Sequence, residues 1–136
     1  MTRIEGTIGT RLLSIILVDD NETARSALRT LISDYPQVGS VREAANADEL
    51  FDMLGGTPPD IVLMEVSLPG MDGFEVTERL LKLHLFIKVI LLTVHNTEEY
   101  GAKANECGAL AFISKQDVVE GLEEALNGIF NEVRTT

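Results

Sequence analysis

The stretch DIVLMEVSLPGMDGFEV, residues 60–76, decides the fold. It opens with the apolar run of residues 60–64, reaches an acid at Glu65 and turns through Pro69 and Gly70 before a second apolar pattern begins. A short apolar run followed by a turn and a helical pattern predicts a buried strand that leads into a helix. The predicted strand ends at a carboxylate, and the question that the sequence raises is why this carboxylate is a glutamate.

Four more apolar runs share this form. They comprise residues 12–18, 41–45, 87–93 and 110–114, and each is followed by polar or turn residues. The run VREAA at 41–45 alternates between apolar and polar residues and is predicted at a sheet edge, whereas the others are predicted to be covered on both faces. Helical patterns separate the runs, so the sequence predicts a parallel sheet with helices on both sides.

The predicted helices have apolar faces and start signals. The face of the first helix comprises Ala24, Leu28, Leu31 and Ile32, and that of the last comprises Val118, Val119, Leu122, Ala125, Leu126, Ile129 and Val133. Asn46 with Glu49, and Asp117 with Glu120, have the spacing of a capping box. These pairs predict where the second and the last helices begin.

Length, composition and charge limit the classes of protein. The 136 residues, 45% of them hydrophobic, predict one folded domain, with residues 1–10 as a flexible leader. No apolar run is long enough to span a bilayer and no secretory signal is present, so a cytoplasmic location is expected. Cys107 has no partner for a disulfide and is predicted to be a buried structural thiol. The net charge of −11, without a basic stripe, predicts no direct contact with nucleic acid.

Polar residues follow the predicted strands at the point where ligands bind in parallel α/β sheets. These residues are Asp19 and Asp20, then Glu65, Thr93 and Lys115, in chain order. Carboxylates with room for water suit Mg²⁺, and a hydroxyl and an amine beside them could hold the oxygens of a phosphoryl group. The motifs GxxxxGK[ST] and GxGxxG are absent, so a bound nucleotide is not expected.

Each of these residues also has an ordinary structural interpretation. Asp20 or Asn21 could cap the first helix, Lys115 could be a solvated surface residue, and Thr93 could simply end a strand. The combined order of two acids, an acid, a threonine and a lysine at successive strand ends favours a site over five coincidences.

Four segments carry a resemblance to a known family. They are ILVDDNETAR (16–25), DIVLMEVSLPGMDGFEV (60–76), VILLTVH (89–95) and GALAFISKQD (108–117). Together they resemble the receiver domain of bacterial two-component response regulators, over residues 12 to 133. The resemblance implies an α/β, flavodoxin-like, doubly wound (βα)5 fold whose five-stranded parallel sheet has the order 2-1-3-4-5. The receiver domain is expected over residues 11–134, with residues 135–136 as a tail.

The resemblance also implies residue roles. Asp19, Asp20 and the residue at position 65 would hold Mg²⁺ together with the backbone carbonyl of Ser67. The phosphoryl group would be held by Thr93 and Lys115, and Phe112 would be the switch aromatic that moves with Thr93. His95, two residues past Thr93, would tune hydrolysis, although a solvated loop histidine is an equal alternative.

Glu65 stands where the family carries the aspartate that accepts phosphate. Its additional methylene moves the carboxylate forward by about 1 Å or more, and misplacement of a reacting group by about 1 Å can cost on the order of a hundredfold in rate. The hypothesis is that Glu65 is a poor phosphoacceptor and a partial imitation of phosphoaspartate, because one carboxylate has less charge and fewer oxygens than a phosphoryl group. An engineered phosphomimetic and a natural receiver that has lost acceptor chemistry both remain open as its origin.

The resemblance implies partners rather than catalysis. A sensor histidine kinase or a phosphotransfer protein would be the donor, and the signal would leave through the surface of the fourth helix, fifth strand and fifth helix. The segment GALAFISKQD is most similar to receivers fused to LuxR-type helix-turn-helix output domains, which predicts a role in transcription regulation. A stand-alone receiver and a homodimer remain open. The alternative classes are a Mg²⁺-binding pseudo-receiver scaffold without phosphoryl transfer and a metal-dependent phosphohydrolase.

Overall fold

The computed structural model describes residues 11–95 and 97–135, in which strands and helices alternate. The strands are β1 (Leu13–Val18), β2 (Val38–Ala44), β3 (Ile61–Glu65), β4 (Lys88–Thr93) and β5 (Ala111–Ser114). The helices are α2 (Glu22–Ser33), α3 (Ala47–Met53), α4 (Gly73–Leu83), α5 (Glu98–Cys107) and α6 (Val118–Thr135), and a 3-10 turn, η1 (Lys115–Asp117), precedes α6. Every predicted strand is present.

The five strands form one parallel sheet of order β2-β1-β3-β4-β5. This confirms the predicted flavodoxin-like topology. The edge position predicted for the alternating run is also confirmed, because β2 pairs with β1 alone and leaves several side chains exposed or half-buried. The register fixes the site, since Glu65 at the end of β3 lies opposite Leu92 in β4 and Thr93 lies opposite Ser114 in β5.

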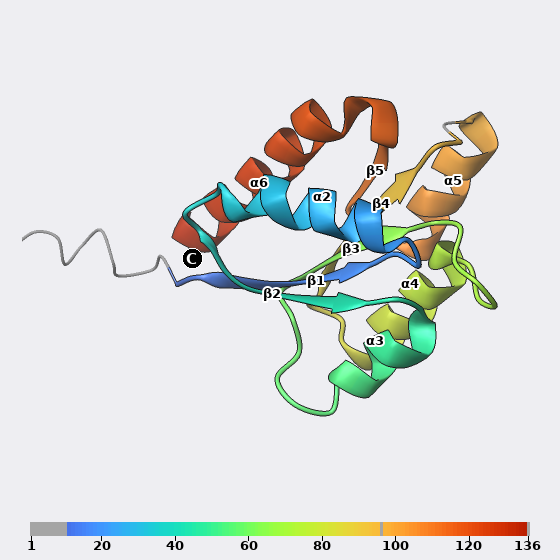
Figure 1. The fold of residues 1–136 in the computed structure, drawn as a ribbon, viewed down its shortest axis with the longest axis horizontal. Helices are drawn as coiled ribbons and strands as arrows, with labels where there is room; N and C mark the ends of the chain where they lie inside the picture. Colours follow the sequence, from blue (N-terminus) through green and yellow to red (C-terminus); the bar gives the residue numbers. More distant parts are fainter. Residues whose placement is uncertain (1–10, 96, 136) are drawn as a thin grey trace, which may run out of the picture.

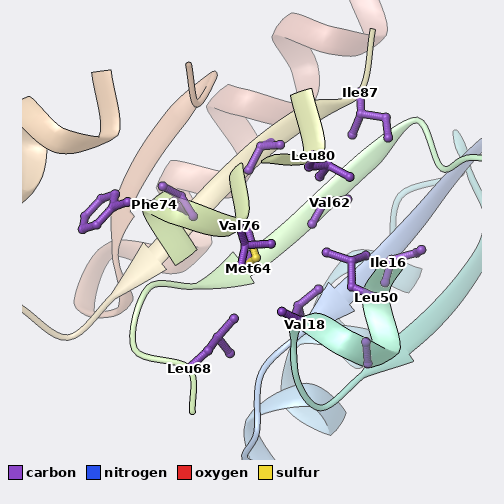
Figure 2. Packing of buried hydrophobic residues seen from close by; sticks show 14 of the residues in the cluster. Ile16, Val18, Leu50, Val62, Met64, Leu68, Phe74, Val76, Leu80 and Ile87 are labelled. Carbon is purple, nitrogen blue, oxygen red and sulfur yellow. The ribbon is translucent and has the colours of Figure 1, made fainter. Parts of the chain in front are cut away.

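Helices cover both faces of the sheet (Figure 1). Alternate side chains of β3 serve the two sides: Ile61 and Leu63 pack with α2 and α6, while Val62 and Met64 pack with α3, α4 and α5. Figure 2 shows the second of these layers, in which Met64 lies close to Val76 of α4. Because both faces of β3 are covered by buried hydrophobic side chains, this central strand is apolar up to Glu65.

Two helix starts follow the predicted capping chemistry. The side chain of Asn21 accepts a hydrogen bond from the backbone N–H of Ala24, and Asn46 accepts one from the N–H of Glu49. The last helix begins differently. It continues from η1, whose N-cap is Ser114, so that Asp117 lies within the helical chain rather than before it.

The predictions for the two termini, the last helix and Cys107 compare with the structure as follows. The predicted leader, residues 1–10, lies outside the described residues, and the predicted tail begins at Thr135, the last residue of α6. Val119 is 53% exposed, and its place on the apolar face of the last helix is therefore wrong, while Phe130 is buried on that face. Cys107 is buried as predicted. Within the described ranges, no helix has the length and apolar character needed to cross a membrane.

The turn between β3 and α4 is packed against the first residue of the helix. The backbone N–H of Gly73 donates to the carbonyl oxygen of Val66 at 2.7 Å. A Cβ atom at position 73 would lie 2.8 Å from the carbonyl oxygen of Glu65 and 2.9 Å from the Cα of Val66. Only glycine allows this approach, and the approach sets the path of the chain immediately after Glu65.

We expect Gly73→Ala to lower the free energy of unfolding by about 1–3 kcal/mol, because the new methyl group must displace backbone rather than a flexible side chain. Gly128→Ala is the matched control, since a Cβ there meets nothing within 4 Å and alanine favours the helix by about 0.5–1 kcal/mol. Urea unfolding measured on both variants tests this. Equal stability of the two variants would contradict the close approach at Gly73.

Candidate functional site

The predicted site residues lie at the carboxyl ends of neighbouring strands. Asp19 directly follows β1, Glu65 ends β3, Thr93 ends β4, and Lys115 directly follows β5. Asp19 and Glu65 are 2% and 6% exposed, and Thr93 is fully buried. The fold therefore places two carboxylates and a hydroxyl, all nearly inaccessible to water, at one edge of a sheet whose remaining interior is apolar.

Lys115 joins the two buried carboxylates. From the end of the edge strand it extends past β4, and its Nζ lies 2.5 Å from Oε1 of Glu65 and 3.1 Å from Oδ2 of Asp19. Its side chain is 27% exposed, against 8% for Glu65 and 4% for Asp19. One ammonium group thus contacts acids that follow or end two different strands, and the structure brings Asp19, Glu65 and Lys115 of the predicted site residues together.

The other carboxylate oxygens bind backbone N–H groups. Oε2 of Glu65 accepts a hydrogen bond from the N–H of Ser67 at 3.0 Å, and Oδ1 of Asp19 accepts one from the N–H of Asn21 at 2.9 Å. Each of the four oxygens of the two acids therefore has a donor. Buried carboxylates need such partners, because an unpaired charge in an apolar surrounding is very costly.

The two acids determine the protonation state of Lys115. Burial alone lowers the pKa of an ammonium group, but here hydrogen bonds and charge attraction from Glu65 and Asp19 outweigh burial and raise the pKa of Lys115 above its ordinary value of 10.5. Lys115 is therefore cationic at any physiological pH.

A second ion-pair cluster holds the turn at Asp19 and was missed by the sequence analysis. Nη1 of Arg25, in α2, donates to the backbone carbonyl oxygen of Asp19 at 2.6 Å, and its Nε donates to Glu43 of β2 at 2.9 Å. Arg29 also donates to Glu43, and the two arginines lower the pKa of that carboxyl group. No sequence motif indicates this cluster, because it depends on the pairing that places Glu43 opposite Leu17, two residues before Asp19.

The hydroxyl group of Thr93 binds its own loop. Its Oγ1 accepts a hydrogen bond from the backbone N–H of His95 at 2.9 Å. The His95 ring is exposed and lies edge-on to Tyr100, with ring centroids 6.4 Å apart. The hydroxyl is therefore engaged with the loop after β4, and Lys115 alone of the two predicted phosphoryl-binding residues contacts position 65.

Phe112, the predicted switch aromatic, lies on β5, three residues before Lys115. It is half-buried and packs against the hydrophobic layer that α3, α4 and α5 form with the sheet. Leu91, directly opposite it in β4, belongs to the same layer. Rotation of the ring would change its contacts with this layer, which is a packing change alone because phenylalanine carries no hydroxyl group.

The predicted magnesium ligands have suitable chemistry but are not arranged as a metal site. Oxygen donors from acids and a backbone carbonyl are what Mg²⁺ prefers. Nevertheless, within the part of the chain that the structure describes, no three Asp, Glu, His or Cys side chains are placed to hold a metal ion. Asp20 is exposed, and the two buried acids bind the Lys115 ammonium. The arrangement does not fit a bound divalent cation unless Lys115 moves.

The fold and the site define a class of protein. A doubly wound parallel sheet of order 2-1-3-4-5, with an acid after β1, an acid at the end of β3, a threonine at the end of β4 and a lysine after β5, is a flavodoxin-like α/β domain with a polar site at the carboxyl ends of its strands.

Comparisons with known proteins give the family. Residues 15–127 match the model of the response regulator receiver domain, and the chain belongs to this family. Escherichia coli K12 UvrY, a response regulator, is 31% identical over 121 residues, which cover 86% of this chain and 56% of UvrY. The nitrate/nitrite response regulator NarL of the same strain is 29% identical, over 85% of this chain and 55% of NarL. The chain thus spans about half the length of these relatives.

Solved structures agree with this assignment. A two-component response regulator of the LuxR family from Aurantimonas sp. SI85-9A1 has a TM-score of 0.82 and 32% identity, covering 89% of this chain and 86% of that one. A CheY-like receiver domain from Methanospirillum hungatei JF-1 has a TM-score of 0.80 and 25% identity, covering 91% and 98%. The predicted resemblance to LuxR- and NarL-like receivers is confirmed. Receivers are signalling domains that generally bind Mg²⁺ and exchange phosphoryl groups with histidine kinases or phosphotransfer proteins.

We expect Lys115→Met to lower the free energy of unfolding at pH 7 by roughly 2–4 kcal/mol, because it leaves two buried carboxylates without a counter-charge. This range allows for solvent screening of the partly exposed ammonium. Lys82→Met, at an exposed position of α4, is the matched control and should change stability by less than about 0.5 kcal/mol. Urea unfolding of the three proteins measures the difference, and a Lys115 variant as stable as the control would contradict the role of the ion pair.

The same ion pair predicts a dependence on pH. Because folding raises the pKa of Lys115, the folded state holds the proton more tightly, and the contribution to stability is complete below pH 10.5 and is lost as the pH rises through the raised pKa. The stability difference between this chain and Lys115→Met should therefore stay constant between neutral pH and about pH 10 and shrink above pH 10.5. Unfolding curves at a series of alkaline pH values test this, and a difference that shrinks toward acid pH instead would refute it.

Proposed function

We propose that this chain is a receiver in which Glu65 occupies the phosphoacceptor position. Its carboxylate is not phosphorylated, so the charge at this position stays the same in the presence of a phosphoryl donor. The observation that carries this proposal is the short ion pair between Glu65 and Lys115 at the carboxyl edge of the sheet. Position 65 ends the central strand β3, between Asp19 of β1 and Thr93 of β4, which is where a receiver would place its acceptor.

The acceptor chemistry is blocked for a geometric reason. In-line attack on a phosphoryl donor needs a free carboxylate oxygen in one position, and misplacement by about 1 Å can cost on the order of a hundredfold. Both oxygens of Glu65 are already hydrogen-bonded, one to Lys115 and one to the N–H of Ser67, and the side chain is nearly inaccessible. An attacking oxygen would have to break one of these bonds and reach the donor.

The imitation of a phosphorylated acceptor is partial. Glu65 contacts Lys115, as a phosphoryl group would, but Thr93 keeps its hydrogen bond to the loop at His95. A carboxylate also has one oxygen and nearly one charge fewer than a phosphoryl group. We therefore propose a modest shift of the population toward the signalling state, since a ligand-like group can shift an equilibrium only by its differential contacts.

The signal would leave through α5, β5 and α6, with Phe112 as the packing element that couples this surface to Thr93. Support comes from the register, because Thr93 lies opposite Ser114 in β5 and Phe112 lies two residues before Ser114 in the same strand. His95 would tune access to the site from the adjoining loop. The partner at the input side would be a histidine kinase or phosphotransfer protein in the cytoplasm.

The output would be transcriptional, by analogy with relatives such as NarL. This chain covers 55% of NarL, so an output domain of helix-turn-helix type is proposed for the whole regulator rather than for these residues. The receiver itself would bind protein partners, and a homodimer is one arrangement compatible with this role.

Incubation with acetyl phosphate and Mg²⁺, followed by intact-mass spectrometry, tests the proposal. We expect Glu65→Asp to gain the mass of one phosphoryl group and this chain to gain none, because only the shorter carboxylate has the reach of an acceptor. Glu65→Gln is the matched control, since an amide cannot form the acyl phosphate.

Labelling of the unaltered chain at position 65 would overturn the claim that one methylene disables the acceptor. If Glu65→Asp also stays unlabelled, the receiver chemistry of Thr93 and Lys115 is lost and the pseudo-receiver scaffold replaces it.

A further inference from the structure

Both buried acids of the site have complete sets of donors in this fold. The four oxygens of Asp19 and Glu65 bind the Lys115 ammonium twice and two backbone N–H groups. The Ser67 N–H, which belongs to the residue whose carbonyl would be a metal ligand, points to Glu65. A divalent cation would have to displace Lys115 from both acids before it could bind their oxygens.

The length of the glutamate side chain makes this arrangement possible. Lys115 starts beyond β5, two strands away from β3, and approaches Glu65 more closely than Asp19, at 2.5 Å against 3.1 Å. An aspartate in the same backbone would withdraw the carboxylate by up to about 1.5 Å, the length of one carbon–carbon bond. With Lys115 in its present position, a shorter side chain at position 65 would lengthen the contact now made by Oε1.

We propose that Lys115 is the resident cation of this site and takes the place of the divalent metal ion beside Asp19 and Glu65, where it offsets one of their two negative charges. The site is consequently metal-independent, and Mg²⁺ binds it weakly. This inference goes beyond the proposed function, because it rests on the donors of the two acids and holds whether or not position 65 has a role in signalling.

The binding preferences of Mg²⁺ and of an ammonium group support the replacement of the metal ion by Lys115. Mg²⁺ requires a nearly octahedral oxygen shell and gives up its water reluctantly. An ammonium group needs fewer ligands and is held by the chain itself, so its binding costs no association entropy. With Asp20 exposed, no third carboxylate is placed beside the pair within the described residues to outweigh the lysine.

The experiment compares Mg²⁺ binding by this chain and by Glu65→Asp with isothermal titration calorimetry, at constant ionic strength. The thermal unfolding temperature with and without Mg²⁺ is a second readout. We expect the aspartate variant to bind Mg²⁺ at least about tenfold more tightly, which is the size of effect that one altered neighbour has on a metal site. Its unfolding temperature should rise with Mg²⁺, while that of the unaltered chain should not.

A matched control separates this site from the acidic surface, because the chain carries a net charge of −11. The Mg²⁺ affinity that Glu65→Asp gains should be lost again in the double variant Glu65→Asp/Asp19→Asn, which removes the second acid of the pair. Lys115→Met should gain affinity as well, and if that variant does not fold, the comparison with Glu65→Asp still decides. The inference is overturned if this chain and Glu65→Asp have the same affinity, whether both bind Mg²⁺ or neither does.

The outcomes also separate this inference from the proposed function. A Glu65→Asp variant that binds Mg²⁺ but stays unlabelled by acetyl phosphate would support the lysine exchange and reject the acceptor position. Labelling of that variant without a gain in Mg²⁺ affinity would do the reverse.

Discussion

The ion pairs from Lys115 to Glu65 and Asp19 are the interaction on which the functional edge of this receiver depends. They connect residues up to 96 positions apart in the chain and join the ends of β1, β3 and β5, past the intervening β4. Without them, two carboxylates that are 2% and 6% exposed would lie unpaired next to an apolar interior. The two acids lie close together because the buried parallel strands end on the same side of the sheet. Lys115, directly after the last strand, supplies a positive charge to both acids.

The turns that follow the two acids are held by hydrogen bonds from neighbouring elements. Arg25 and Glu43 hold the turn at Asp19, while the contact of Gly73 with Val66 sets the turn after Glu65. Lys115, in contrast, is a flexible side chain at the start of a short 3-10 turn. Any change of state at this edge is therefore more easily accommodated by the lysine and by the loop after β4 than by the two acids.

Thr93 and Lys115, the two residues proposed to hold a phosphoryl group, make different contacts in this structure. Lys115 contacts position 65, as it would contact a phosphorylated acceptor, whereas Thr93 remains bound to the backbone of His95. A carboxylate has too few oxygens to engage both residues as a phosphoryl group does. The half-buried Phe112 lies two residues before Ser114, the residue opposite Thr93, so it belongs to the strand that pairs with this part of the site.

The local patterns of the sequence determined the strands, their parallel direction and the residues at their ends, whereas the order of the strands was predicted from the family resemblance. Apolar runs that end near Asp19, Glu65 or Thr93 are local patterns. The alternation in residues 41–45 was enough to predict the edge strand, because a strand buried on one face alternates apolar and polar residues, whereas a strand buried on both faces is apolar throughout. The start of the last helix and the exposure of Val119 were predicted less well. Packing decides both that a 3-10 turn precedes α6 and which side chains of this helix face the sheet.

The tertiary structure alone decided how these residues pair. The sequence suggested a metal between Asp19, Asp20 and Glu65, while the fold brings a lysine from another strand onto two of these acids and leaves the third exposed. It also revealed Arg25 and Glu43, which have no motif. The physical reason is that ion pairs depend on distances between side chains from different strands, and such distances exist only once the sheet has formed.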